Sequence, residues 1–155
     1  MDPRVKATAA DLSSQFSLSR QLYDAWITLA PVMEQVRSIR TQLADLKSRA
    51  KDDELRKQIE TLDQKLQTVA GTANAPPNPA TPPTLATAVT RLRSLFNIIQ
   101  AVDTAPTTQT AAAVPEVLSE TQSLIERWRT MDGRDIPALN EQLRAAGLAV
   151  LEIRK

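Results

Sequence analysis

The chain has 155 residues, with Gly at only three positions and aromatic residues at 3%, a composition that favours helices over sandwiches and barrels. Its formal net charge of +1 at pH 7 provides no long-range field to attract nucleic acid, which we therefore do not expect as a partner. Because Cys and His are both absent, the sequence excludes disulfides, zinc or haem sites built on these residues, and His-dependent nucleophile systems.

The N-terminal residues show no targeting or membrane signal. No apolar run approaches the roughly 20 residues of a membrane span, so no membrane insertion is expected. Met1 to Arg4 lack the apolar core of a signal peptide, and any export signal would lie upstream. Pro3 disfavours helix locally, so residues 1–8 are predicted to form an extended lead-in, with Thr8 or Asp11 capping the first helix.

The longest apolar pattern predicts a first helix over residues 9–50. Its apolar residues repeat in alternating steps of three and four, which is typical of a helix that packs against partner helices. Phe16, Trp26 and Met33 flank this seam and are expected to widen it into the face of a bundle helix. The seam consists of Leu18, Leu22, Ala25, Leu29, Val32, Val36, Ile39, Leu43, Leu46 and Ala50.

Two signals interrupt this pattern. Pro31 falls inside the seam, but the apolar phase continues across it, so we expect one kinked helix rather than two. Past Ala50 the same phase would bury charged residues, and the apolar set restarts at Leu55. This phase change predicts a tight hairpin, with Asp52 or Asp53 as N-cap of a second helix over residues 53–70.

The remaining elements are predicted from Gly, Pro and Thr positions. Gly71 ends the second helix, and five prolines within residues 72–83 predict an extended, polyproline-like strap. Thr104 is expected to cap the fourth helix, Pro115 to leave its first turn loose, and Asp132-Gly133 to end it. The predicted third, fourth and fifth helices cover residues 84–102, 107–131 and 136–146.

These elements predict one all-α domain over residues 9–155: an antiparallel four-helix-type bundle with a long kinked first helix and a short C-terminal fifth helix. No residue set indicates a catalytic, cofactor or metal site. Glu116 and Glu120 lie one turn apart, but polar neighbours favour a solvated face over paired catalytic carboxylates. Trp26 and Trp128 could form a stacking platform for sugars, although their positions favour packing.

The lengths of the first two helices indicate where a partner could bind. At about 1.5 Å per residue the first helix is roughly 60 Å long and the second only about 27 Å. The N-terminal half of the first helix must therefore be covered by later helices or by another molecule. We expect the candidate interaction surface at Phe16, Tyr23 and Trp26.

Three groups of short segments can be compared with known proteins: Asp2-Pro3-Arg4-Val5 with Asp11-Leu12 and Gln15-Phe16; Val36-Arg37-Ser38-Ile39-Arg40 with Gln42-Leu43; and Ile136-Pro137-Ala138-Leu139-Asn140 with Leu143-Arg144 and Gly147-Leu148. Together they resemble the C-terminal helical region of large bacterial BNR/sortilin-like β-propeller proteins, which are often labelled glycosyl hydrolases. The resemblance implies an extracytoplasmic accessory domain that follows a propeller. The family's ligand surface would belong to the propeller, so no catalytic residue is implied in this chain.

The expected function is thus a non-catalytic structural and protein-interaction module. Its partner would be the preceding propeller, another protein, or a second copy in self-association. The alternative is a ligand-binding or catalytic accessory domain of a carbohydrate-active protein, which a buried polar cluster or a deep apolar pocket would favour.

Overall fold

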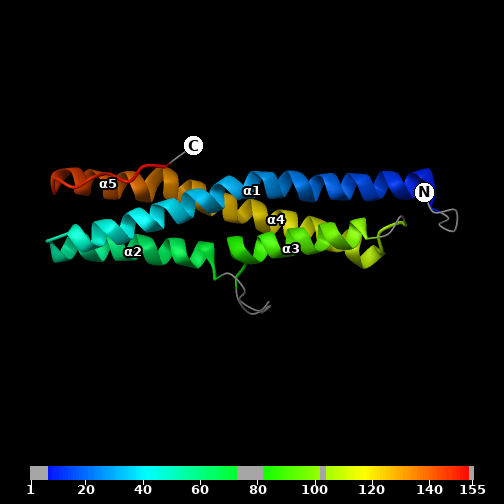
Figure 1. The fold of residues 1–155 in the computed structure, drawn as a ribbon, viewed down its shortest axis with the longest axis horizontal. Coiled ribbons are helices and arrows are strands. Elements are labelled where there is room, and N and C mark those ends of the chain that lie inside the picture. Colours follow the sequence, from blue (N-terminus) through cyan, green and yellow to red (C-terminus); the bar gives the residue numbers. More distant parts are fainter. Residues whose placement is uncertain (1–6, 73–81, 102–103, 154–155) are drawn as a thin grey trace.

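The computed structural model describes residues 7–72, 82–101 and 104–153. Within these ranges the chain forms helices and no strands, so the predicted all-α bundle is confirmed (Figure 1). The elements are α1 (Ala9–Arg49), α2 (Asp53–Ala70), α3 (Leu85–Gln100), α4 (Thr108–Thr130), the π-helical turn η1 (Met131–Asp135) and α5 (Ile136–Ala145).

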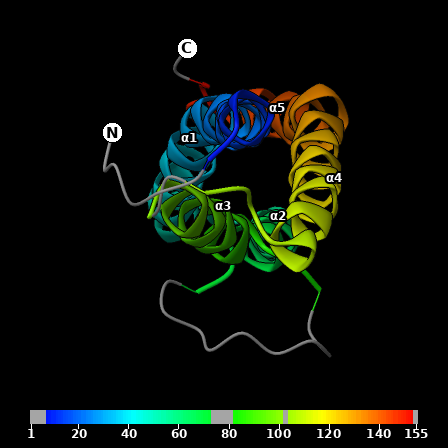
Figure 2. The ribbon, with the colours of Figure 1, turned by 90° about the vertical axis from the view of Figure 1, so that its right-hand side faces the viewer.

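The helices form an elongated antiparallel bundle. Helices α2 and α3 lie end to end and run opposite to α1, and α4, η1 and α5 return along the bundle as one column (Figure 1). In one half α1, α3 and α4 contact one another, whereas in the other half α2 contacts both α1 and α5. The view along the bundle shows the helices arranged around a common centre (Figure 2). The predicted strap and lead-in fall largely in residues 73–81 and 1–6, outside the described residues.

Helix α1 begins with a capping box. The Thr8 side chain accepts a hydrogen bond from the Asp11 backbone N–H at 3.2 Å, and the Asp11 carboxylate accepts one from the Thr8 backbone N–H at 2.9 Å. This backbone hydrogen bond lowers the pKa of Asp11, because it stabilises the ionised carboxylate. The helix continues through the exposed Pro31, and its axis changes direction near the middle (Figure 1). One bent helix, rather than two, is therefore confirmed.

The predicted seam of α1 forms its buried face: eight of its residues are buried, and Leu18 and Ala25 are partly buried against the core. The expectation that Phe16 widens this face is wrong, because its side chain is 69% exposed. An α-helix has 3.6 residues per turn, so an apolar pattern that repeats every 3.5 residues shifts gradually around the helix. Phe16 lies outside the buried face that results. Met33 is partly buried against the core, as expected.

The connections on both sides of α2 depend on specific contacts. The Asp52 side chain caps α2 by accepting from the Glu54 backbone N–H at 3.0 Å, and the Arg56 guanidinium donates to the Ala50 carbonyl at 2.7 Å. Gly71 follows α2 with a φ of 72°, and a Cβ there would lie 2.2 Å from the Thr84 hydroxyl oxygen. The end of α2 therefore meets the start of α3 so closely that only glycine fits.

A polar layer ties the C-terminal end of α3 to α1. The buried Gln15 side chain donates to the Ile99 carbonyl at 2.6 Å, and the Gln100 side chain donates to the hydroxyl of Ser19, also buried, at 2.6 Å. The last four carbonyls of a helix have no partner within it, so Gln15 satisfies one of them. This layer aligns α3 along α1.

The column of α4, η1 and α5 differs from the prediction in three respects. Helix α4 is capped by Thr107, whose hydroxyl accepts from the Thr110 backbone N–H at 3.2 Å, so the expected cap at Thr104 is wrong. Pro115 lies inside a continuous helix rather than after a loose turn. The expected end at residues 132–133 is also wrong, because the chain passes through η1 directly into α5.

The wide turn of η1 has a physical reason in the sequence that follows it. Pro137 would clash with the preceding turn and leave one carbonyl unpaired in a regular helix, and the extra residue of a π-helical turn relieves this conflict. Asp135 in this turn accepts from the Lys65 side chain of α2 at 3.0 Å. That hydrogen bond lowers the pKa of Asp135 despite desolvation by burial, and neighbouring Arg134 lowers it further.

The segment after α5 folds back along the bundle. Gly147 has a φ of 70°, and the Leu148 backbone N–H donates to the Leu143 carbonyl at 2.9 Å, a geometry that closes the helix. Leu151 is then buried, and side-chain amides hold its own backbone and that of the next residue. Asn140 of α5 bonds both backbone groups of Leu151 at 2.7 and 3.1 Å, and Gln42 of α1 bonds both of Glu152 at 2.8 and 2.9 Å.

Candidate interaction surface

The three residues of the predicted interaction surface all lie on the N-terminal half of α1. Phe16 is 69% exposed, Tyr23 46% and Trp26 38%. The rings of Tyr23 and Trp26 meet edge to face with centroids 6.5 Å apart. Phe16 precedes Tyr23 by seven residues, two helical turns, and therefore lies on the same side of the helix.

Helix α3 borders this surface and orients Trp26. The Arg93 guanidinium lies 5.9 Å from the centroid of the Trp26 ring, a cation–π contact that holds the indole at the edge of α3. Tyr23, Trp26, Arg93 and Phe96 line a small hollow of about 150 Å³ between the two helices. Trp26 thus lies at the boundary between core and surface, and the expectation that it packs in the core holds only for part of its ring.

Sequence reasoning missed one member of this surface, Ile27, which is 53% exposed. Ile27 completes a second pattern of alternating three- and four-residue steps, displaced by two residues from the core seam. We call this exposed pattern the outer stripe: Ser13, Phe16, Arg20, Tyr23, Ile27 and Ala30. The spacing of the outer stripe can be read from the sequence. It is a weak signal, however, because Arg20 interrupts the apolar residues of the stripe and because the core seam of the same helix is longer.

The charged residues of this surface are paired on α1 itself. Arg20 donates from Nε to both carboxylate oxygens of Asp24 at 3.0 Å, and both side chains are more than half exposed. Such an exposed pair contributes little to stability, about 0.3–0.5 kcal/mol. Its exposure leaves both groups accessible to an opposite charge on another molecule.

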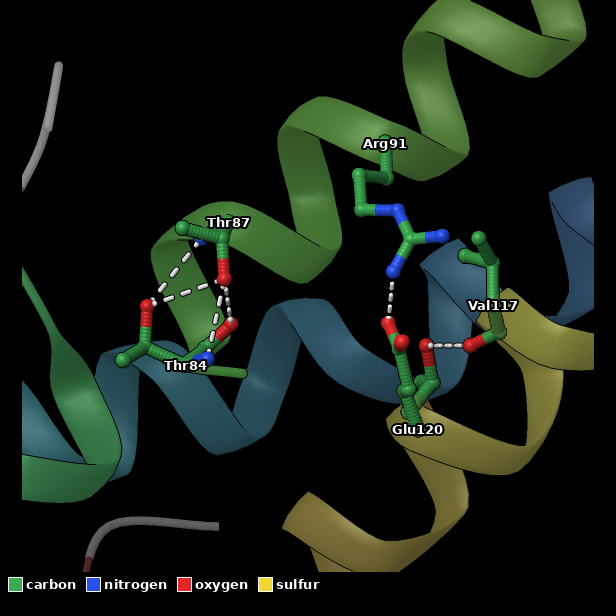
Figure 3. Close-up of polar contacts among 6 residues, drawn as sticks. Thr84, Thr87, Arg91, Val117 and Glu120 are labelled. Atoms are coloured by element: carbon green, nitrogen blue, oxygen red, sulfur yellow. Dashed lines mark hydrogen bonds and ion pairs between the residues drawn. The ribbon is translucent and has the colours of Figure 1, made fainter. Parts of the chain in front are cut away.

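The acidic residues Glu116 and Glu120 of α4 lie in different surroundings. Glu120 is partly buried and forms an ion pair with Arg91 of α3, which crosses the interface between the two helices (Figure 3). Glu116 is exposed. In the same view the Thr84–Thr87 capping box starts α3, and the Val117 carbonyl accepts a hydrogen bond within α4. The Arg91–Glu120 ion pair therefore links α3 to α4, whereas the other two contacts lie within α3 and within α4.

The second tryptophan is a core residue, as favoured from the sequence. Trp128 is 3% exposed, and its indole N–H donates to the side-chain oxygen of Gln35 on α1 at 3.0 Å. Trp128 lies on α4 beside core residues and Trp26 on the outer edge of α1, so the structure does not bring them together as a sugar-stacking platform.

A hollow of about 480 Å³ lies between the middle of α1, the end of α2 and the start of α3. Arg37 and Arg40 line it, but each is engaged in an ion pair, with Glu34 at 3.2 Å and Asp63 at 2.7 Å respectively. Among the described residues there is no group of three or more acidic side chains that could hold a metal ion. No described helix is long and apolar enough to cross a membrane.

Comparisons of the chain with protein-family models, curated proteins and solved structures found no match. The resemblance to the helical region that follows a β-propeller therefore stays a prediction from short sequence segments.

Proposed function

We propose that this chain is a non-catalytic helical module for protein interaction, and that it docks through the outer stripe of α1. One observation carries the proposal. Of the five large hydrophobic side chains that are exposed in the described part of the chain, four lie within residues 16–27 of α1. Single exposed apolar residues are ordinary on protein surfaces, whereas a contiguous group is typical of a binding site.

The neighbouring contacts indicate that the side chains of this surface are held in place and are not a loosely packed edge of the core. Tyr23 and Trp26 are held by their mutual ring contact, and Arg93 covers one side of the indole. The helix beneath them is secured by buried residues on its opposite side, among them Leu22 and Leu29 at 1% and 0% exposure. Aromatic side chains that are already oriented lose little conformational entropy on binding, which favours them as interface anchors.

The alternative, a ligand-binding or catalytic accessory domain, has weaker support. The buried polar side chains Gln15 and Ser19 bond to the end of α3, so they serve the helix packing rather than a ligand. The two arginines beside the hollow between α1, α2 and α3 are already paired with carboxylates. A preceding propeller domain as the partner, and an extracytoplasmic location, are proposed from the sequence resemblance alone.

The proposal is tested by placing a photoreactive benzophenone amino acid at residue 27 and, as a matched control, at residue 98. Ile27 and Ile98 are both 53% exposed, but Ile98 lies on α3 outside the stripe. We expect discrete cross-linked products from residue 27, in the purified chain or in producing cells, that disappear when Tyr23 and Trp26 are replaced by Ser. Equal product patterns from both positions would contradict the proposal.

A further inference from the structure

We propose that the partner of the outer stripe is a second copy of this chain, bound antiparallel across a two-fold axis between residues 21 and 22. This inference rests on the proposed function, because it names the molecule that covers the same surface. The first support is the spacing of the stripe. Its members follow one another in steps of three, four, three, four and three residues, the repeat by which one helix packs along another.

The stripe is self-complementary in the antiparallel direction. A two-fold axis between residues 21 and 22 pairs positions whose numbers add up to 43. Phe16 then faces Ile27 of the second copy, and Arg20 faces Tyr23 of the second copy. The first pair is apolar, and the second matches a guanidinium with an aromatic ring, the contact that Arg93 already makes with Trp26.

The ends of the stripe are small. Ser13 and Ala30 are exposed and become the outermost pair of the same register. Small residues there allow the two helices to approach along the whole stripe, which is about 25 Å long at 1.5 Å per residue. A self-complementary patch of this kind forms a closed dimer rather than an open chain of molecules.

Charge selects the antiparallel arrangement over the parallel one. In a parallel pair each Arg20 would meet Arg20 of the second copy, and each Asp24 would meet Asp24. In the antiparallel pair, Arg20 lies one residue along the axis from Asp24 of the second copy, so the two exposed ion pairs form a network of alternating sign. The contact area of one short helix stripe is below the standard interface size, and we therefore expect dissociation constants in the micromolar range.

The register can be tested by disulfide trapping, because the chain contains no Cys. Two single variants, Ser13→Cys and Ala30→Cys, change exposed residues without removing an apolar anchor. In the antiparallel dimer each new thiol lies beside the other position, whereas like positions are about 25 Å apart. An equimolar mixture of the two variants in a thiol redox buffer should yield covalent dimers, and each variant alone should yield few.

The affinity is measured by sedimentation equilibrium of the whole chain from about 1 µM to 1 mM, a range that spans the weak affinities of small interfaces. Ile27→Ser should raise the dimer dissociation constant at least tenfold, while the matched Ile98→Ser should change it less than twofold. Helical content by circular dichroism should be the same in both variants. As a control for random collision, Ser119→Cys on α4, mixed with Ala30→Cys, should not trap dimers.

The outcomes separate the two proposals. A wild-type chain that stays monomeric up to 1 mM, or that dimerises with each single variant trapping itself as in a parallel pair, would overturn the antiparallel self-association. Discrete products with a different protein from residue 27 would then still support the interaction module. If residues 27 and 98 give the same cross-linked products, and these persist when Tyr23 and Trp26 are replaced by Ser, both the interaction module and the antiparallel dimer would be overturned.

Discussion

The C-terminal segment provides the sharpest test of how side chains hold this fold, through the variant Asn140→Ala. Asn140 makes two hydrogen bonds to the backbone of Leu151, and a typical bond contributes a net 0.5–1.5 kcal/mol. The second clamp, Gln42 on Glu152, contributes a similar amount, and burial of Leu151 adds about 2 kcal/mol. Ordering six residues, 148–153, costs about 1–2 kcal/mol each. Leu148 and Ile153, partly buried against the core, add to these gains, so the gains and the ordering cost are of similar size and docking of the segment is only marginally favourable.

Loss of both Asn140 bonds should consequently undock the whole segment. The measurement is amide hydrogen exchange of the Glu152 backbone N–H, which is bonded to Gln42 and not to Asn140. A loss of about 2 kcal/mol corresponds to roughly 30-fold faster exchange at Glu152. Exposed Asn97→Ala serves as a control and should leave that rate unchanged.

Global stability distinguishes undocking from damage to the bundle. If the segment undocks as a unit, Asn140→Ala should lower the free energy of unfolding by no more than removal of residues 148–155 does. In the shortened chain the same substitution should have almost no effect. Continued protection of Glu152 in Asn140→Ala would refute the view that the two clamps act together.

Three further predictions concern the core, the polar layer and pH. Leu29→Ala, at a side chain with 0% exposure, should lower the free energy of unfolding in denaturant titrations by about 2–5 kcal/mol. Gln15→Ala should lower it by about 1–3 kcal/mol in the same assay, because the Ile99 carbonyl loses its donor, and a smaller effect would show that water replaces the amide. Since the Lys65 hydrogen bond lowers the pKa of Asp135, the stability that Asp135 provides is present above about pH 4 and is lost as pH falls through its lowered pKa. The difference in unfolding free energy between wild type and Asp135→Asn should shrink on acidification, and a constant difference would contradict this assignment.

Most helix boundaries could be predicted because they depend on local chemistry. Thr8 and Asp52 cap their helices within a few residues of their own position, so the sequence contains the whole interaction. The change of apolar phase after Ala50 likewise predicts the hairpin, because continuing the helix would bury charges. These signals can be recognised in the sequence without knowing which other helices pack against these segments.

The continuity of α4, η1 and α5 could not be predicted because it depends on a rare local geometry. Residues 132–133 form an Asp-Gly pair, which ends a helix when the glycine adopts a positive φ, but the positive-φ glycines in the described chain are Gly71 and Gly147. The contact between Asp135 and Lys65 and the burial of Met131 instead stabilise a π-helical turn. The preferences of single residues do not reveal a contact such as Lys65–Asp135, whose partners lie 70 residues apart in the sequence.

The sequence predicts a candidate surface on α1 that does not include the exposed Ile27, and the reason lies in the two seams of α1. Both repeat in steps of three and four residues, two positions apart, so spacing alone does not decide which one faces the core. Arg20 marks the outer stripe as the exposed one, yet Phe16 and Tyr23 contribute more apolar area than Leu18 or Ala25 on the core seam. The outcome depends on where α3 packs, and the bonds from Gln15 and Ser19 to its C-terminal end place it beside Trp26 and leave Phe16 and Ile27 exposed. The polar layer at the C-terminal end of α3 thus lies beside the boundary between the buried seam and the exposed outer stripe of α1.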